Sequence, residues 1–169
     1  MEFRKGASKT EIEEAIKEKG DFIKIDYLSR FLKNADNLET KKYLHLSLAG
    51  IYESKNMFND AVKHMSAAAD IAMTFKDKIN LHLKEAEIYI KQKNFEMADR
   101  AFKKVYSLGN TEERQEIQSQ YLEYYRMHAK ITENQGKARG ALEIYEKLYS
   151  LPQDDSKKQE IKLKLLELY

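Results

Sequence analysis

The chain has 169 residues, of which 34% are charged and only one is proline, as expected for a helical protein. Its 30 basic and 28 acidic residues are interleaved and leave a net charge of +2, so the composition gives no reason to expect a nucleic-acid or membrane partner. The absence of cysteine excludes disulfides, thiolate metal sites and thiol nucleophiles, and no run approaches the roughly 20 apolar residues that a membrane span needs. Residues 1–5 lack the apolar core of a signal peptide, and we therefore expect a cytoplasmic protein.

The first predicted element is a helix pair over residues 9–36. A turn is expected at Lys19-Gly20-Asp21, since glycine can take the left-handed conformation that closes a helix. The second helix carries an aromatic residue and then residues at spacings of three, four and three, which share one helical face. These residues are Phe22, Ile25, Ser29 and Leu32.

The same spacing recurs in the next two predicted pairs, over residues 39–76 and 78–109. It is carried by Phe58, Ala61, Met65 and Ala68, and again by Phe95, Ala98, Phe102 and Val105. Turns are expected at Ser54-Lys55-Asn56 and at Lys93-Asn94, where asparagine also tolerates the left-handed conformation. Both segments are therefore predicted to fold as helix, tight turn, helix.

The fourth predicted pair covers residues 111–151, with a turn at Asn134-Gln135-Gly136, and a terminal helix follows over 155–169. Six additional residues fall between Tyr106 and Tyr124 and should lengthen the first helix of this pair at its start. Pro152 marks a break before the terminal helix, and Ser156 with Gln159 is the expected capping box there.

A second column of positions gives the same period. Its last member falls at residues 16, 52, 89, 132 and 169, in steps of 36, 37, 43 and 37 residues. Small residues accompany both columns and should let paired helices approach closely; they are Ala49, Ala61, Ala86, Ala98, Ala129 and Ala141. The fold class predicted from this period is an all-α, right-handed α-solenoid of about four degenerate helix pairs plus a C-terminal helix.

The pattern resembles the tetratricopeptide repeat (TPR), most clearly from Tyr43 to Leu108. A small residue and a tyrosine on a first helix are followed, nine residues after the tyrosine, by an alanine: Tyr52 by Ala61 and Tyr89 by Ala98. The steps exceed the usual 34 residues, which is similar to the longer-repeat subclass of vesicle-fusion adaptors and bacterial peptide-sensing regulators. The resemblance implies a scaffold that binds another protein and no enzymatic activity. It does not extend to the carboxylate clamp of chaperone-binding members, because Leu46 and Gly50 stand at the corresponding places.

Two ionisable residues, Glu85 and His128, interrupt a column that is otherwise apolar. If successive first helices pack side by side, these two side chains could form a partly buried, pH-sensitive contact. The alternative is that both lie at the edge of the helix interface, with their polar ends in water.

No arrangement typical of catalysis or of a cofactor is found. The four histidines form no His-x-x-x-His pair, and there is no phosphate-binding glycine loop, nucleophile elbow or zinc signature. His45 and His82 occupy equivalent repeat positions, which favours a packing role. Tyr121, Tyr124 and Tyr125 are open to two interpretations, as core residues or as a binding surface.

The family resemblance implies a concave groove lined by the first helices of the pairs, in which a partner's peptide or helix would bind. The candidate residues on the exposed face of those helices are Leu46, Gly50, Glu53, Leu83, Glu87, Ile90, Arg126, Lys130 and Glu133. Leu46 and Leu83 would suit an apolar anchor, and Arg126 and Lys130 an acidic group. The alternative for the two leucines is packing between helices.

The last helix is apolar on more than one side, whereas the terminal helix of a repeat array should show water a polar face. Either the natural protein continues past Tyr169, or this surface pairs with another copy of the chain. Self-association would use Leu163, Leu165, Leu166 and Tyr169. The second functional hypothesis is therefore a regulatory or oligomerisation segment of a larger protein.

Overall fold

The computed structural model describes residues 6–169; residues 1–5, compared above with a signal peptide, lie outside the described part. Within residues 6–169 the protein is all-α, as predicted, with nine helices and no strand. The helices are α1 (Lys9–Ile16), α2 (Asp21–Asn34), α3 (Leu38–Ser54), α4 (Phe58–Asp70), α5 (Phe75–Lys91), α6 (Phe95–Leu108), α7 (Thr111–Asn134), α8 (Ala138–Ser150) and α9 (Asp155–Leu168).

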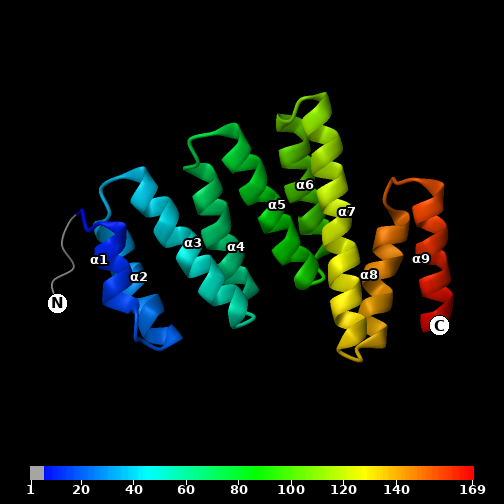
Figure 1. The fold of residues 1–169 in the computed structure, drawn as a ribbon, viewed down its shortest axis with the longest axis horizontal. Coiled ribbons are helices and arrows are strands. Elements are labelled where there is room, and N and C mark those ends of the chain that lie inside the picture. Colours follow the sequence, from blue (N-terminus) through cyan, green and yellow to red (C-terminus); the bar gives the residue numbers. More distant parts are fainter. Residues whose placement is uncertain (1–5) are drawn as a thin grey trace.

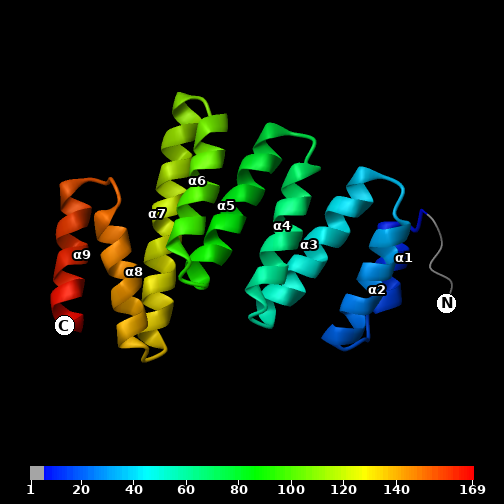
Figure 2. The ribbon, with the colours of Figure 1, turned by 180° about the vertical axis from the view of Figure 1, so that it is seen from behind.

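The helices follow one another in chain order along the long axis of the molecule. Figure 1 shows α1 and α9 at opposite ends of this row, and Figure 2 shows the same order from behind. With one exception, the extensive contacts within residues 6–169 join helices that are adjacent in the chain. The exception joins α5 to α7. The buried apolar residues accordingly divide into three clusters, over α1–α3, α3–α5 and α5–α9.

Small residues allow the close approach of the helices. The alanines at 49, 61, 86, 98, 129 and 141 have no exposed surface, which confirms their predicted place between packed helices. Tyr121 and Tyr125 are also buried, at 2% and 0% exposure, so they are core residues and not a binding surface. Phe22 is an exception to the pattern, because it begins the repeat face of α2 and yet is 72% exposed.

Three of the four predicted turns close with a left-handed residue. Asn56 and Lys93 have φ of 58°, and Gly136 has φ of 72°. In the third turn the left-handed residue is therefore Lys93 and not Asn94, whose side chain instead caps the start of α6. Gly20 has φ of −66° and precedes α2 in an extended conformation, so the expected left-handed closure of α1 is wrong.

The helix starts use side-chain caps in most places. Capping boxes form at Ser8 with Glu11 and at Asn110 with Glu113. The predicted box of Ser156 and Gln159 does not form, because α9 already begins at Asp155. The additional residues of the long step lengthen α7 at its start, as predicted, and make it the longest described helix, at 24 residues.

Candidate functional site

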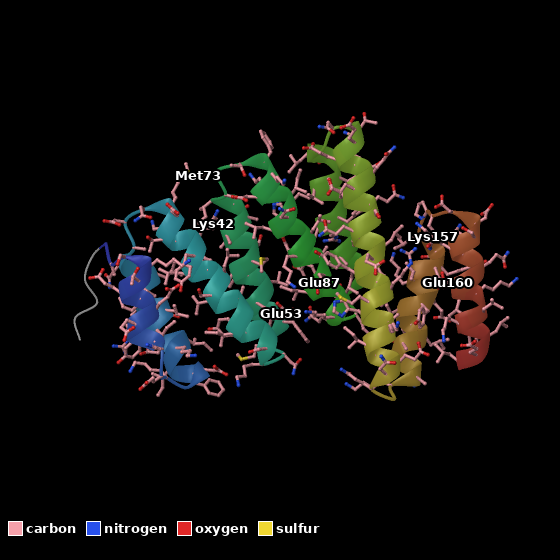
Figure 3. All side chains as sticks on the ribbon, in the orientation of Figure 1. Lys42, Glu53, Met73, Glu87, Lys157 and Glu160 are labelled. Atoms are coloured by element: carbon pink, nitrogen blue, oxygen red, sulfur yellow. The ribbon has the colours of Figure 1, made fainter. Side chains whose placement is uncertain are left out.

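A cleft of about 720 Å³ opens where the C-terminal parts of three odd-numbered helices come together. We call it the main cleft: its walls include Gly50, Glu53 and Ser54 of α3, Glu87 and Lys91 of α5, and Met127, His128, Ile131 and Thr132 of α7. Figure 3 labels Glu53 and Glu87, which lie close together on α3 and α5. Three helices, α3, α5 and α7, therefore contribute to one cleft.

Part of the wall supplied by α7 is apolar. Met127 is 37% exposed and Ile131, one turn later, is 42% exposed, and both line the main cleft. Opposite them, Gly50 leaves the α3 wall open, since a Cβ built there would meet no atom within 4 Å. The main cleft therefore presents apolar surface that the protein itself does not cover.

The polar side of the main cleft is a cluster of charged residues around Glu87, which is only 4% exposed. We call this set the Glu87 cluster; it comprises Glu53, Lys84, Glu87, Lys91 and His128. The Glu87 carboxylate accepts hydrogen bonds from His128 Nε2 at 3.0 Å and from Lys84 Nζ at 2.7 Å, and Lys91 Nζ lies 3.3 Å away. Lys91 also donates to Glu53 and so connects α5 to α3.

The environment of Glu87 strongly favours its ionised form. Burial alone raises the pKa of its carboxyl. Two effects act against burial: the hydrogen bonds from His128 and Lys84, and the charges of Lys84 and Lys91. Together they outweigh the effect of burial and lower the pKa from 4.5 to about 2. At neutral pH the cluster therefore holds a buried carboxylate between cations, and it ties α5 to α7 through His128.

The predicted contact between Glu85 and His128 is wrong. His128 contacts Glu87, while Glu85 accepts a hydrogen bond from His82 Nδ1 at 2.8 Å on its own helix. Residues 85 and 87 point to different sides of a helix with 3.6 residues per turn, and the side of α5 that faces α7 carries residue 87. The alternative interpretation fails for His128 as well, because this side chain is 6% exposed and does not reach water at an edge.

The nine predicted groove residues do not form one surface. Gly50, Glu53 and Glu87 line the main cleft. Arg126, Lys130 and Glu133 line a second cleft of about 430 Å³, between α7, α8 and α9.

The other three predicted residues lie in neither cleft. Leu46 is partly buried and borders a cavity beside α1. Leu83 and Ile90 are 1% and 0% exposed and belong to the core, so their expected exposure is wrong. For Leu83 this is the alternative given above, packing between helices.

Sequence reasoning missed the apolar wall of the main cleft and the lysines that line it, Lys91 among them. Met127 and Ile131 are four residues apart, as are Glu87 and Lys91, and such pairs share a helical face. That spacing could have pointed to both pairs. It could not have shown that the two faces meet across α5 and α7.

Two further observations concern residues 6–169. Within residues 6–169, no group of three or more histidine, aspartate or glutamate side chains is placed to hold a metal ion. In the same range, no helix combines the length and the apolar character required to cross a bilayer.

Comparisons with family models, with curated proteins and with solved structures found no match to this chain.

Proposed function

We propose that this protein is an interaction scaffold: a right-handed solenoid of TPR-like helix pairs that binds a peptide or helix of a partner protein in the main cleft. The row of helix pairs with neighbour-to-neighbour contacts supports the solenoid, because each unit in such an array packs against the next. The repeated small-residue columns support the resemblance to the TPR family.

The observation that carries this proposal is the exposed apolar wall of the main cleft beside the Glu87 cluster. Partner-binding surfaces characteristically combine a central apolar anchor site with a polar surround that fixes orientation. A cleft of about 720 Å³ can accept a few side chains of a bound helix or extended peptide. Because the cations and carboxylates of the cluster already pair with one another, we assign them to specificity and not to catalysis.

The test is a selection of peptides from a random displayed library on the wild-type protein. Enriched peptides are then titrated against Met127→Glu and Ile131→Glu, which put charge on the apolar wall. We expect each variant to weaken binding by about tenfold or more, the effect of losing a central anchor contact. Met73→Glu is the matched control, because Met73 is 83% exposed and lies in the connection before α5, away from the main cleft (Figure 3).

If the selected peptides bind the two cleft variants as tightly as the wild type, the main cleft is not the binding site. Circular dichroism of each variant shows whether the fold is intact, and the exposure of both side chains makes unfolding an unexpected result.

A second candidate function, self-association through α9, is favoured by the exposure of its outer face. Leu163, Leu166 and Tyr169 are 63%, 65% and 80% exposed, whereas Leu165 packs against the core. Light scattering across a dilution series tests this function: a concentration-dependent dimer that Leu166→Glu returns to monomer would support it. A monomer at every concentration would rule it out for this chain.

A further inference from the structure

All four histidines of the chain have a partner through a ring nitrogen, but one of these contacts differs in kind from the others. His82 and His128 each face a carboxylate, Glu85 and Glu87 respectively. His45 of α3 and His64 of α4 instead face each other, with their Nδ1 atoms 2.9 Å apart. Two imidazoles with converging nitrogens are the ligand type that late transition metals prefer.

We propose that His45 and His64 form a two-imidazole chelate for a divalent transition metal ion such as Zn²⁺, through their Nδ1 atoms. This site is independent of the binding function proposed for the main cleft.

The distance between the two nitrogens is close to what such an ion needs. Zinc binds imidazole nitrogen at about 2.0–2.1 Å, so two nitrogens in a tetrahedral shell lie about 3.3 Å apart. The present separation of 2.9 Å needs to widen by only about 0.4 Å, which small rotations of the two rings supply. Both side chains are partly exposed, so water can complete the coordination shell.

The surroundings hold one ring in place and favour the neutral form of both rings. Tyr52 stacks on His64 with ring centroids 5.5 Å apart and planes within 6° of parallel. Burial lowers the pKa of His45. Burial also lowers the pKa of His64, and the positive charges of His45 and Lys63 add to this effect, against an opposing contribution from Asp60. A neutral imidazole is the form that binds metal, so protons compete less at this pair.

Metal binding requires a change of tautomer in one of the two rings. Without metal, one ring must carry hydrogen on Nδ1 and donate it to the bare Nδ1 of the other. When the ion binds both Nδ1 atoms, the donor ring changes tautomer and carries its hydrogen on Nε2. Both rings stay neutral, and two Nδ1 lone pairs coordinate the ion.

The experiment uses the full chain, freed of metal by chelation and titrated with Zn²⁺. Long-range ¹H–¹⁵N spectra of the histidine rings report which nitrogen of each ring carries hydrogen. We expect His45 and His64 both to become Nε2-protonated, while His82 and His128 keep their carboxylate contacts unchanged. Mg²⁺, which prefers oxygen ligands, should leave all four rings unaltered.

Variants provide the second measurement. His45→Gln and His64→Gln should each weaken Zn²⁺ binding in calorimetry by more than the roughly tenfold that losing even a supporting partner of a metal site costs. His82→Gln is the matched control, because His82 lies outside both the His45–His64 pair and the main cleft and a glutamine amide can still donate to Glu85; its affinity for Zn²⁺ should equal that of the wild type.

Two results would overturn the proposal. One is a Zn²⁺ affinity that is unchanged in the doubly substituted protein, which would reveal adventitious binding elsewhere. The other is a wild-type spectrum in which Zn²⁺ leaves the tautomers of His45 and His64 as they were. The spectrum decides the question even if the variants do not fold.

Discussion

Glu87 is the single residue on which most interactions of the main cleft converge. Its carboxylate contacts Lys84, Lys91 and His128 while almost wholly buried. A buried charge with several partners stabilises a fold only while it remains ionised, because its protonation leaves the surrounding cations without compensation. The stability of the protein should therefore depend on pH through this residue.

The pH dependence follows from the pKa of Glu87, which is about 2 in the folded chain and 4.5 as the ordinary value. A lowered folded pKa means that its contribution is complete above about pH 4.5 and is lost as the pH falls towards 2. We expect the wild type to lose about 3 kcal/mol of unfolding free energy in this window through Glu87. Urea denaturation at pH 7, 4 and 2.5 measures the loss.

Glu87→Gln should lower the unfolding free energy at pH 7 by about 1–3 kcal/mol and flatten the pH profile below 4.5. Glu123→Gln serves as the matched control, since this α7 carboxylate is 68% exposed and should change stability by less than about 0.5 kcal/mol. A Glu87→Gln protein with the full acid sensitivity of the wild type would contradict the assignment.

Leu46 and Leu83 occupy equivalent positions in the sequence but have different environments in the fold. Leu83→Ala should cost about 2–5 kcal/mol of unfolding free energy, because it leaves a cavity in the core beneath α5. Leu46→Ala should cost about half as much or less, as that side chain is only partly buried. Thermal and urea unfolding of both variants compare them directly, and equal losses would show that the two sites are buried alike.

At the scale of single residues, the main cleft could be predicted from the sequence only in part. Repeat spacing was enough to bring Gly50, Glu53 and Glu87 together in the main cleft. It could not separate Glu85 from Glu87 as the partner of His128, because that choice depends on how α5 is rotated against α7. The His45–His64 contact was also beyond it, since 19 residues and a turn separate the two histidines.

At the scale of helices, the closing residues of the turns differ in how well they suit their conformation. Lys93 adopts φ of 58°, which disfavours any residue with a Cβ, whereas Gly136 adopts φ of 72° with no such penalty. Asn56 shares the conformation of Lys93, and asparagine tolerates it better.

Lys93→Gly should therefore raise the unfolding free energy by up to about 1 kcal/mol. The ion pair of Lys93 with Glu143 is exposed at both ends, so its loss offsets little of that gain. Gly136→Ala is the converse substitution and should lower stability by about 1 kcal/mol; its new Cβ meets nothing within 4 Å, so the cost is conformational. Chemical denaturation measures both, and changes of the same sign would contradict this explanation.

The helices themselves were predictable because local residues determine them. Turn residues and the aromatic-small-bulky spacing located the connections between α3 and α4, α5 and α6, and α7 and α8. The failures at Gly20 and Ser156 have a common cause: more than one residue near a helix end can serve as its cap, and tertiary packing decides which one does.

At the scale of the whole molecule, the two end helices have the fewest neighbours. In the described chain, α9 makes extensive contact only with α8, and α1 only with α2. We expect amide hydrogen exchange to be fastest in α1 and α9 and slowest in α5, α6 and α7, whose cluster is the largest. Mass spectrometry of exchanged peptides measures this gradient; equal protection of all helices would indicate that the chain opens as a single unit.

The positions of the helices in the sequence could be predicted more accurately than the arrangement of the odd-numbered helices in space. A repeat pattern states which residues are small or bulky, but the angle between successive pairs depends on the packing of every interface between them. That angle brings Met127 and Ile131 of α7 opposite Gly50 of α3 and separates Arg126 and Lys130 into the second cleft.

The short sequence separation of these contacts also bears on how the chain reaches its fold. Proteins whose contacts join residues near one another in sequence fold quickly, because little loop entropy is lost before each contact forms. Here each described helix after α1 packs extensively against a helix one or two places earlier in the chain. During synthesis, the helices can therefore dock in the order in which they leave the ribosome, and the α5–α7 contact that completes the main cleft forms as soon as α7 emerges.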